Sequence, residues 1–195
     1  MIKKYCMQDY YYVSTVKEHL DYKIKLIDAI ESMPSHESFK PYENLTNQDY
    51  RLPEDFPRPY LDLFYEMVVP YVKDLGNLLG FYAWQIHNAW FQQYYNNDSH
   101  DWHNHACVNF TNIYYLELPS QELVTELYDP HSKKIVNLEG IEEGQFVTFP
   151  GHWIHRSPKN LTNERKTIVA FNTSYGEVDF ESINKALADE MMNND

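Results

Sequence analysis

The chain has 195 residues, of which 43% are hydrophobic and 16% aromatic, and it carries a formal net charge of −13. This length and composition predict one domain with a sizeable core and argue against disorder. The acidic balance, without any run rich in Lys or Arg, argues against a nucleic-acid polymer as partner, because phosphate binding depends on clustered cations.

Targeting and redox signals are weak. The N-terminal residues lack the apolar core of a signal peptide, and no stretch is long and apolar enough to predict a membrane span, so we expect a cytoplasmic protein. Cys6 and Cys107 lie far apart without paired spacing. This pattern predicts neither a disulfide framework nor a thiolate zinc site.

The first part of the chain has helical periodicity. Apolar residues recur at helical spacing over 16–33 and again over 60–79, and a proline-dense connector separates the two segments. Thr15 and Glu18 fit a capping box for the first helix. Residues 1–80 are therefore expected to form a helical N-terminal support.

After Gly80 the pattern changes to alternating aromatic, β-branched and polar residues, which is typical of strands. Strands are expected near 82–94, 101–106, 107–118, 122–128, 134–138, 145–149 and 165–174. Many short strands after helices predict a mainly β fold with flanking helices: a double-stranded β-helix (jelly-roll, cupin-like) core over 81–175, with the helices packed on one sheet. A closing helix is expected within 176–195, so that 1–195 is a single domain.

Three histidines carry the predicted chemistry. His103 and His105 alternate with Asn104, so on a strand both imidazoles point to the same face. His155 follows a strand that ends in a Pro-Gly turn, which can aim it at the same pocket. Three ligands on one face of a six-coordinate Fe(II) leave about three open positions, as oxygen chemistry requires and a closed zinc site does not allow.

Chance is the competing explanation for this pattern. A chain with nine histidines will often place two at a spacing of two, so the His-x-His pair alone is a weak signal. The context of His155, within a Gly-x5-Pro-x4-His pattern, strengthens it. His100 and His152 are expected to be neighbours of the metal ligands at most.

Arg165 comes ten positions after His155 and begins an apolar run. Its guanidinium can hold a carboxylate by two parallel hydrogen bonds, and Thr167 on the same strand face can add a hydroxyl. Arg165 and Thr167 are therefore predicted to bind an acidic co-substrate. The alternative is a surface arginine paired with Glu164 or another of the 29 acidic residues.

The segment from Trp90 to Asn172 resembles the Fe(II)- and 2-oxoglutarate-dependent oxygenases, in particular a small group found in phages and bacteria and related to the prolyl hydroxylases. The resemblance covers somewhat less than half of the chain. It rests on Trp90 to Tyr94, His103-Asn104-His105, Asn112 to Leu116, Gly144 to Pro150 with His155, Glu164-Arg165, and Phe171-Asn172.

The resemblance implies that His103, His105 and His155 bind Fe(II) and that Arg165 binds the distal carboxylate of 2-oxoglutarate. It also implies that O2 is a co-substrate, and Tyr114 is the nearest match to a residue that often assists the arginine. One departure stands out: the superfamily has Asp or Glu where this chain has His105.

The function expected from the resemblance is a dioxygenase that hydroxylates a small molecule or a protein side chain. Two rivals stay open: a three-histidine cupin-type dioxygenase without 2-oxoglutarate, and a non-catalytic jelly-roll binding module. Among acidic residues, Asp101 is poorly placed to replace the missing carboxylate, and Asp98 or Asp129 would need favourable loops. The tyrosine content is compatible with a homodimer.

Overall fold

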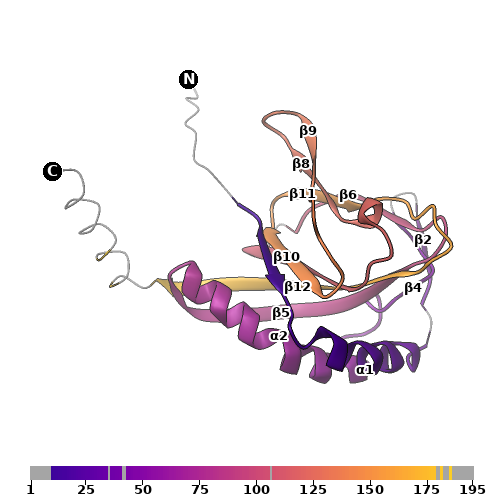
Figure 1. Ribbon diagram of the computed structural model, residues 1–195. Coiled ribbons are helices and arrows are strands. Elements are labelled where there is room, and N and C mark those ends of the chain that lie inside the picture. The colour runs from indigo at the N-terminus through magenta and orange to yellow at the C-terminus, as the bar shows by residue number, and fades with distance from the viewer. Residues whose placement is uncertain are drawn as a thin grey trace.

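The computed structural model describes residues 10–34, 36–40, 43–105 and 107–178, together with Glu181 and Lys185. Within these residues the chain forms two stacked antiparallel sheets with two helices on the outer face of one of them (Figure 1). The predicted fold class, mainly β with a jelly-roll core and helices packed on one sheet, is confirmed.

Both predicted helices are present. Helix α1 spans His19–Glu31 and helix α2 spans Pro59–Leu78, which begins at the proline that helix starts favour. The capping box does not form, because Thr15 ends strand β1 and Glu18 becomes the N-cap without a side-chain cap. The N-terminal region is thus a strand, a helix, three short strands and a second helix, rather than helices alone.

The helix-bearing sheet has the strand order β1-β10-β7-β12-β5-β4. The long antiparallel pair of β5 and β12 forms its spine, and α1 and α2 cover its outer face (Figure 1). Its strands are β1 (Tyr12–Thr15), β4 (Asn47–Gln48), β5 (Phe81–Tyr94), β7 (Phe110–Glu117), β10 (Gln145–Pro150) and β12 (Lys166–Val178).

The second sheet has the order β2-β3-β6-β11-β8-β9 and lies against the inner face of the first. A short 3-10 helix, Gln121–Leu123, precedes β8. The strands are β2 (Ser38–Lys40), β3 (Glu43–Leu45), β6 (Ser99–His103), β8 (Glu126–Asp129), β9 (Lys134–Asn137) and β11 (Ile154–Ser157).

Two apolar cores follow from the alternation of side chains on the shared sheet. Phe91 and Phe171 face the helices, together with Tyr114. Residues of opposite parity, such as Ile113 and Ile168, face the second sheet. The helix-bearing sheet is therefore buried on both faces, and only its inner face can contribute to a site between the sheets.

The expected closing helix over 176–195 falls mostly outside the residues that the structure describes. Strand β12 continues to Val178, so the described part of this segment begins as strand. No helix in the described ranges has the length and hydropathy needed to cross a membrane.

Candidate metal centre

His103 and His155 lie opposite each other on neighbouring strands of the second sheet. His103 is the last residue of β6 and His155 lies in β11, and the two residues are register partners. Their ring centroids are 4.2 Å apart. The expected turn after Pro150 is present, and the strand that follows it pairs with β6 and so brings the two imidazoles together.

His105 follows β6 in a loop that is fastened to the turn between β10 and β11. Its backbone N–H donates to the carbonyl of Gly151 at 2.7 Å, and the N–H of Gly151 donates to the carbonyl of Asn109 at 2.8 Å. A Cβ at Gly151 would lie 2.7 Å from the carbonyl oxygen of Val108 and 2.8 Å from that of His105. Glycine is therefore required for this close approach of two backbones.

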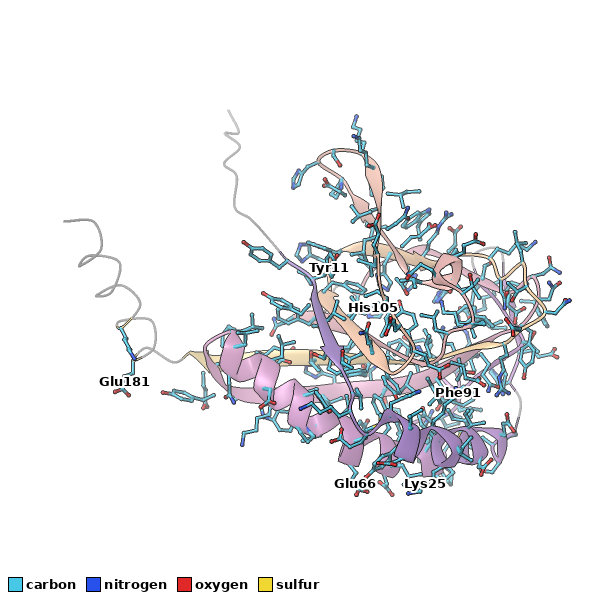
Figure 2. The ribbon with its side chains drawn as sticks, viewed as in Figure 1. Tyr11, Lys25, Glu66, Phe91, His105 and Glu181 are labelled. Atoms are coloured by element: carbon cyan, nitrogen blue, oxygen red, sulfur yellow. The ribbon has the colours of Figure 1, made fainter. Side chains whose placement is uncertain are left out.

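The three predicted ligands converge. One ring nitrogen from each of His103, His105 and His155 lies within 4.8 Å of the others. Figure 2 shows His105 on the inner side of the helix-bearing sheet, whereas Phe91 lies toward the helices. Among the described residues, this is the one group of three or more His, Cys, Asp or Glu side chains close enough together to hold one ion.

Hydrogen bonds fix the tautomer of each imidazole. Nδ1 of His103 lies 2.7 Å from the carbonyl oxygen of Asp101, and Nδ1 of His155 lies 3.1 Å from that of Trp153. A carbonyl can only accept, so both Nδ1 atoms carry the proton. Both Nε2 atoms then keep the lone pair that a metal needs.

His105 is oriented by side chains instead of backbone. Its Nδ1 lies 2.7 Å from Oδ1 of Asn172 and 2.9 Å from the hydroxyl of Thr111. The Nδ2 group of Asn172 donates to Asn88, which leaves its Oδ1 as the acceptor for His105. The third Nε2 is therefore also free to bind an ion.

Burial keeps these imidazoles neutral. It lowers the pKa of His103 and His105, and it lowers the pKa of His155 well below the ordinary value, with a further contribution from His103. Neutral imidazole is the form that binds a transition metal. The donor set thus fits a divalent ion without prior loss of protons at neutral pH.

The cluster lies on the wall of a cavity of about 640 Å³ between the two sheets. The inner face of β12 contributes Ile168, Ala170 and Asn172, and the outer end is lined by Tyr50 and Glu54 among others. The cavity therefore joins the histidine cluster to the surface, as a substrate pocket must.

The predicted co-substrate residues lie on the other face of the same sheet. Arg165 donates from Nε and Nη2 to the carboxylate of Glu117 at 2.7 and 3.0 Å, and from Nη1 to Glu31 at 2.6 Å. Thr167 also bonds to Glu117. This arrangement matches the alternative of an arginine paired with surface acids, and neither residue lines the cavity.

Tyr114 is also directed away from the cavity. Its hydroxyl lies 2.7 Å from Nδ1 of His19, and its ring packs in the core against the helices. The structure therefore brings the three histidines together but separates them from Arg165, Thr167 and Tyr114, the residues assigned to the co-substrate.

Lys166 is a cation on the inner face of β12 that was missed from the sequence. Its side chain is 1% exposed, and Nζ donates to the carbonyl of Leu123 at 2.6 Å and to the hydroxyl of Ser157 at 2.8 Å. Ser157 and the neighbouring Tyr94 line the cavity. Within the described part of the chain, no carboxylate lies at ion-pair distance from Lys166, and burial lowers its pKa to about 7.

None of the acidic candidates joins the cluster. Asp98 accepts from the backbone N–H groups of Thr46 and Tyr95, and Asp129 accepts from those of His131 and Ser132. Both carboxylates therefore stabilise turns. His105 is left as the third nitrogen donor where the resembling oxygenases have a carboxylate.

The comparisons with known proteins bear on the fold. No protein-family model matches the chain, and no curated protein matches it. Solved structures, by contrast, are similar to the chain. A 2OG-Fe(II) oxygenase family oxidoreductase from Burkholderia pseudomallei is similar with a TM-score of 0.64 and 9% identity, over 87% of this chain and 88% of that one.

Two prolyl hydroxylases have the same fold. The enzyme from Pseudomonas putida is similar with a TM-score of 0.57 and 9% identity, over 86% of this chain and 94% of that one. The viral collagen prolyl hydroxylase from Paramecium Bursaria Chlorella virus-1 gives a TM-score of 0.52 and 13% identity, over 84% and 95%. The chain therefore has the fold of the 2-oxoglutarate/Fe(II) oxygenases, and the predicted resemblance is confirmed at that level.

Proposed function

We propose that this chain is an Fe(II)- and 2-oxoglutarate-dependent oxygenase that hydroxylates a small molecule or a protein side chain. The observation that carries the proposal is the set of three imidazoles whose Nδ1 protons are all held by oxygen acceptors, so that three Nε2 lone pairs face one cavity. A cluster with a purely structural role, such as hydrogen bonding in the core, would not need all three imidazoles in the same tautomer.

His103, His105 and His155 would hold the iron. Three ligands leave about three positions of a six-coordinate ion for co-substrate and oxygen. When bound, the iron supplies the activation of O2, and the protein supplies orientation and exclusion of water. The apolar side chains of Ile168 and Ala170 line the same cavity and keep that part of it dry.

Lys166 is the proposed anchor for the distal carboxylate of 2-oxoglutarate, in place of Arg165. A fully buried ammonium without a carboxylate partner is costly to the folded state, and an anionic ligand would offset that cost. Its bond to Ser157 places the charge directly behind a side chain that lines the cavity. Lys166 is the residue after Arg165, and its side chain lies on the inner face of the helix-bearing sheet, the face that also meets the histidine cluster.

The ligands of two solved neighbours support the proposed class of enzyme. The viral prolyl hydroxylase was solved with 2-oxoglutarate. An epimerase of nogalamycin biosynthesis, similar with a TM-score of 0.59 and 10% identity, was solved with Fe3+ and alpha ketoglutarate. An enzyme of this class is therefore the function that fold and cluster together favour.

The outer part of the cavity is the proposed substrate end. Tyr50 and Trp90 pack there with ring centroids 5.0 Å apart, and Trp90 lies 5.7 Å from the ring of His105. Tyr50 is 55% exposed, whereas Trp90 is 7% exposed. This aromatic pair would guide a substrate group from the surface toward the metal.

One observation favours a second candidate, the three-histidine dioxygenase that does not use 2-oxoglutarate. His105 replaces the usual carboxylate, which leaves the metal site one unit more positive than in the resembling oxygenases. Such a site would bind iron without a response to a keto acid.

Anaerobic titration of the purified protein separates these candidates. Fe(II) followed by 2-oxoglutarate should produce a visible charge-transfer absorption that saturates at one equivalent of each. Iron binding without that absorption would favour the second candidate. A protein that binds no iron would be the non-catalytic module.

A further inference from the structure

A chain of hydrogen bonds runs along the cavity wall from Lys166 toward the metal ligands. Lys166 donates to the hydroxyl of Ser157 at 2.8 Å, and Ser157 bonds to the phenol oxygen of Tyr94. Tyr94 donates to Oε1 of Gln92 at 2.9 Å. Nε2 of Gln92 lies 3.3 Å from Nδ1 of His100, which completes the chain.

When Lys166 is protonated, its ammonium fixes the direction of every bond in this chain, because an ammonium can only donate. Ser157 must accept from Lys166 and therefore donates its own proton to Tyr94. The phenol proton then goes to Gln92, which leaves the amide nitrogen of that residue facing His100. A consistent direction of donors makes such networks cooperative.

The last member of the chain has the opposite tautomer to the metal ligands. Nδ1 of His100 accepts from Gln92, so the proton of the neutral ring sits on Nε2. Only an uncharged imidazole can accept at a ring nitrogen, so this bond to Nδ1 requires a neutral ring. Nε2 of His100 therefore carries a proton to donate, whereas Nε2 of each of the three neighbouring imidazoles carries a lone pair.

His100 is placed beside the proposed iron ligands. Its ring stacks on that of His103 with centroids 4.0 Å apart and an interplanar angle of 16°, and it lines the cavity. Glu43, its register partner, accepts from Arg51 at 2.8 Å. Among the described residues, none accepts a hydrogen bond from Nε2 of His100, which leaves that donor for a ligand in the cavity.

We infer that His100 is a second anion-binding residue of this site: its Nε2–H donates to an oxygen of the carboxylate ligand held at the metal beside His103, and the chain from Lys166 keeps it in that tautomer. The inference rests on the proposed function. It assigns donors to both ends of a dicarboxylate, with Lys166 at one end and His100 at the other.

The tautomer can be measured without any ligand. Long-range ¹H–¹⁵N correlation spectra of the imidazoles in the metal-free protein, assigned with His100→Gln, should show His100 protonated on Nε2 and His103, His105 and His155 protonated on Nδ1. A proton on Nδ1 of His100 would overturn the inference. This result does not depend on whether the protein binds 2-oxoglutarate.

Gln92→Glu tests the chain itself. A carboxylate accepts at both oxygens, so His100 would donate from Nδ1 and lose its donor at Nε2. Gln93→Glu is the matched control, because Gln93 faces the other side of β5 and bonds to Asn47. The Fe(II) form of Gln92→Glu should bind 2-oxoglutarate about 10- to 100-fold more weakly than the control variant.

Imidazole, which offers no carboxylate, serves as the reference ligand for the metal. In Gln92→Glu and in His100→Gln, the affinity of the Co(II) form should fall further for 2-oxoglutarate than for imidazole. If Gln92→Glu does not fold, His100→Gln replaces it as the test. This variant removes the fixed ring donor and should also weaken 2-oxoglutarate binding about 10- to 100-fold. Unchanged 2-oxoglutarate affinity in His100→Gln would refute the role of His100, whereas absent binding in the unchanged protein would refute the proposed function.

Discussion

Arg165 and Lys166 are consecutive residues whose side chains lie on opposite faces of one sheet. Arg165 bonds to Glu117 and Glu31 on the helix side, whereas Lys166 is buried between the sheets and bonds to Ser157. Side chains of a strand alternate, so a shift of one residue decides which cation lies between the sheets, bonded to a side chain that lines the cavity.

The pair of variants Lys166→Met and Arg165→Met tests this alternation. We expect Lys166→Met to weaken 2-oxoglutarate binding to the Fe(II) protein about 100-fold, because a charged hydrogen bond to the ligand is lost. Fe(II) affinity should change less than about threefold. Isothermal titration under anaerobic conditions measures both affinities.

Arg165→Met is the matched control for that experiment. It should leave 2-oxoglutarate affinity unchanged and lower the free energy of unfolding by about 1 kcal/mol, since the lost ion pairs are partly exposed. The opposite ranking of the two variants would return the co-substrate role to Arg165.

Binding of 2-oxoglutarate should be coupled to proton uptake. Burial lowers the pKa of Lys166 to about 7, and a bound carboxylate would raise it again. Above pH 7 the free protein holds a neutral amine, so binding takes up a proton and the affinity falls up to about tenfold per pH unit. Titrations at pH 8 in buffers of different ionisation enthalpy would count that proton, and a count of zero would contradict the assignment.

Asn172 should control the metal affinity through His105. Asn172→Leu removes the acceptor at 2.7 Å from Nδ1, so the ring can rotate or change tautomer. We expect Zn(II) or Fe(II) affinity to fall about 10- to 100-fold. Asn172→Asp keeps an acceptor at that place and should bind within a few-fold of the unchanged protein; equal losses in both variants would indicate a purely structural role.

Gly151→Ala should displace the His105 loop. The added Cβ meets two backbone oxygens at 2.7 and 2.8 Å, and neither can move without moving the loop. Metal affinity should fall at least about tenfold, by the same loss of ligand orientation. Gly176→Ala is the control, because a Cβ there meets no atom within 4 Å. Metal affinity that survives in Gly151→Ala would show that His105 is not needed.

The metal-free protein should lose stability as pH falls below about 6.5. Burial lowers the pKa values of His100 and His155, so over this interval the unfolded chain binds protons that the folded chain excludes. Each such histidine contributes up to about 1.4 kcal/mol per pH unit. Urea unfolding at pH 7.0 and 5.5 measures the slope, which should be smaller in His100→Gln; an unchanged slope would contradict the neutral buried state.

The fold class and the metal cluster could be predicted from local patterns. Alternation with a period of two indicates strands, and it also places His103 and His105 on one side. The strand that carries His155 was not expected, because Pro150 and Gly151 before it are typical of a turn. Its pairing with β6 and β8 depends on residues distant in sequence, which local propensity does not contain.

The face of β12 could not be predicted, because the strand is buried on both sides. Residues Ile168 to Phe171 are all apolar, so no polar alternation marks which side meets the cavity. With that signal absent, the assignment of Arg165 depended on a match in spacing. A bulge in the pairing of β12 with β7, between Thr167 and Ile168, makes such spacing unreliable by one residue.

The three nitrogens proposed to bind iron come from β6, the loop after it, and β11, so a bound ion would join parts of the chain about fifty residues apart. Any metal that binds only the folded state adds about 2.7 kcal/mol to its stability when its free concentration is 100 times the dissociation constant. In a cell, the level of this protein should then follow the iron supply, with chains made under iron starvation removed sooner by proteases than those made in its abundance.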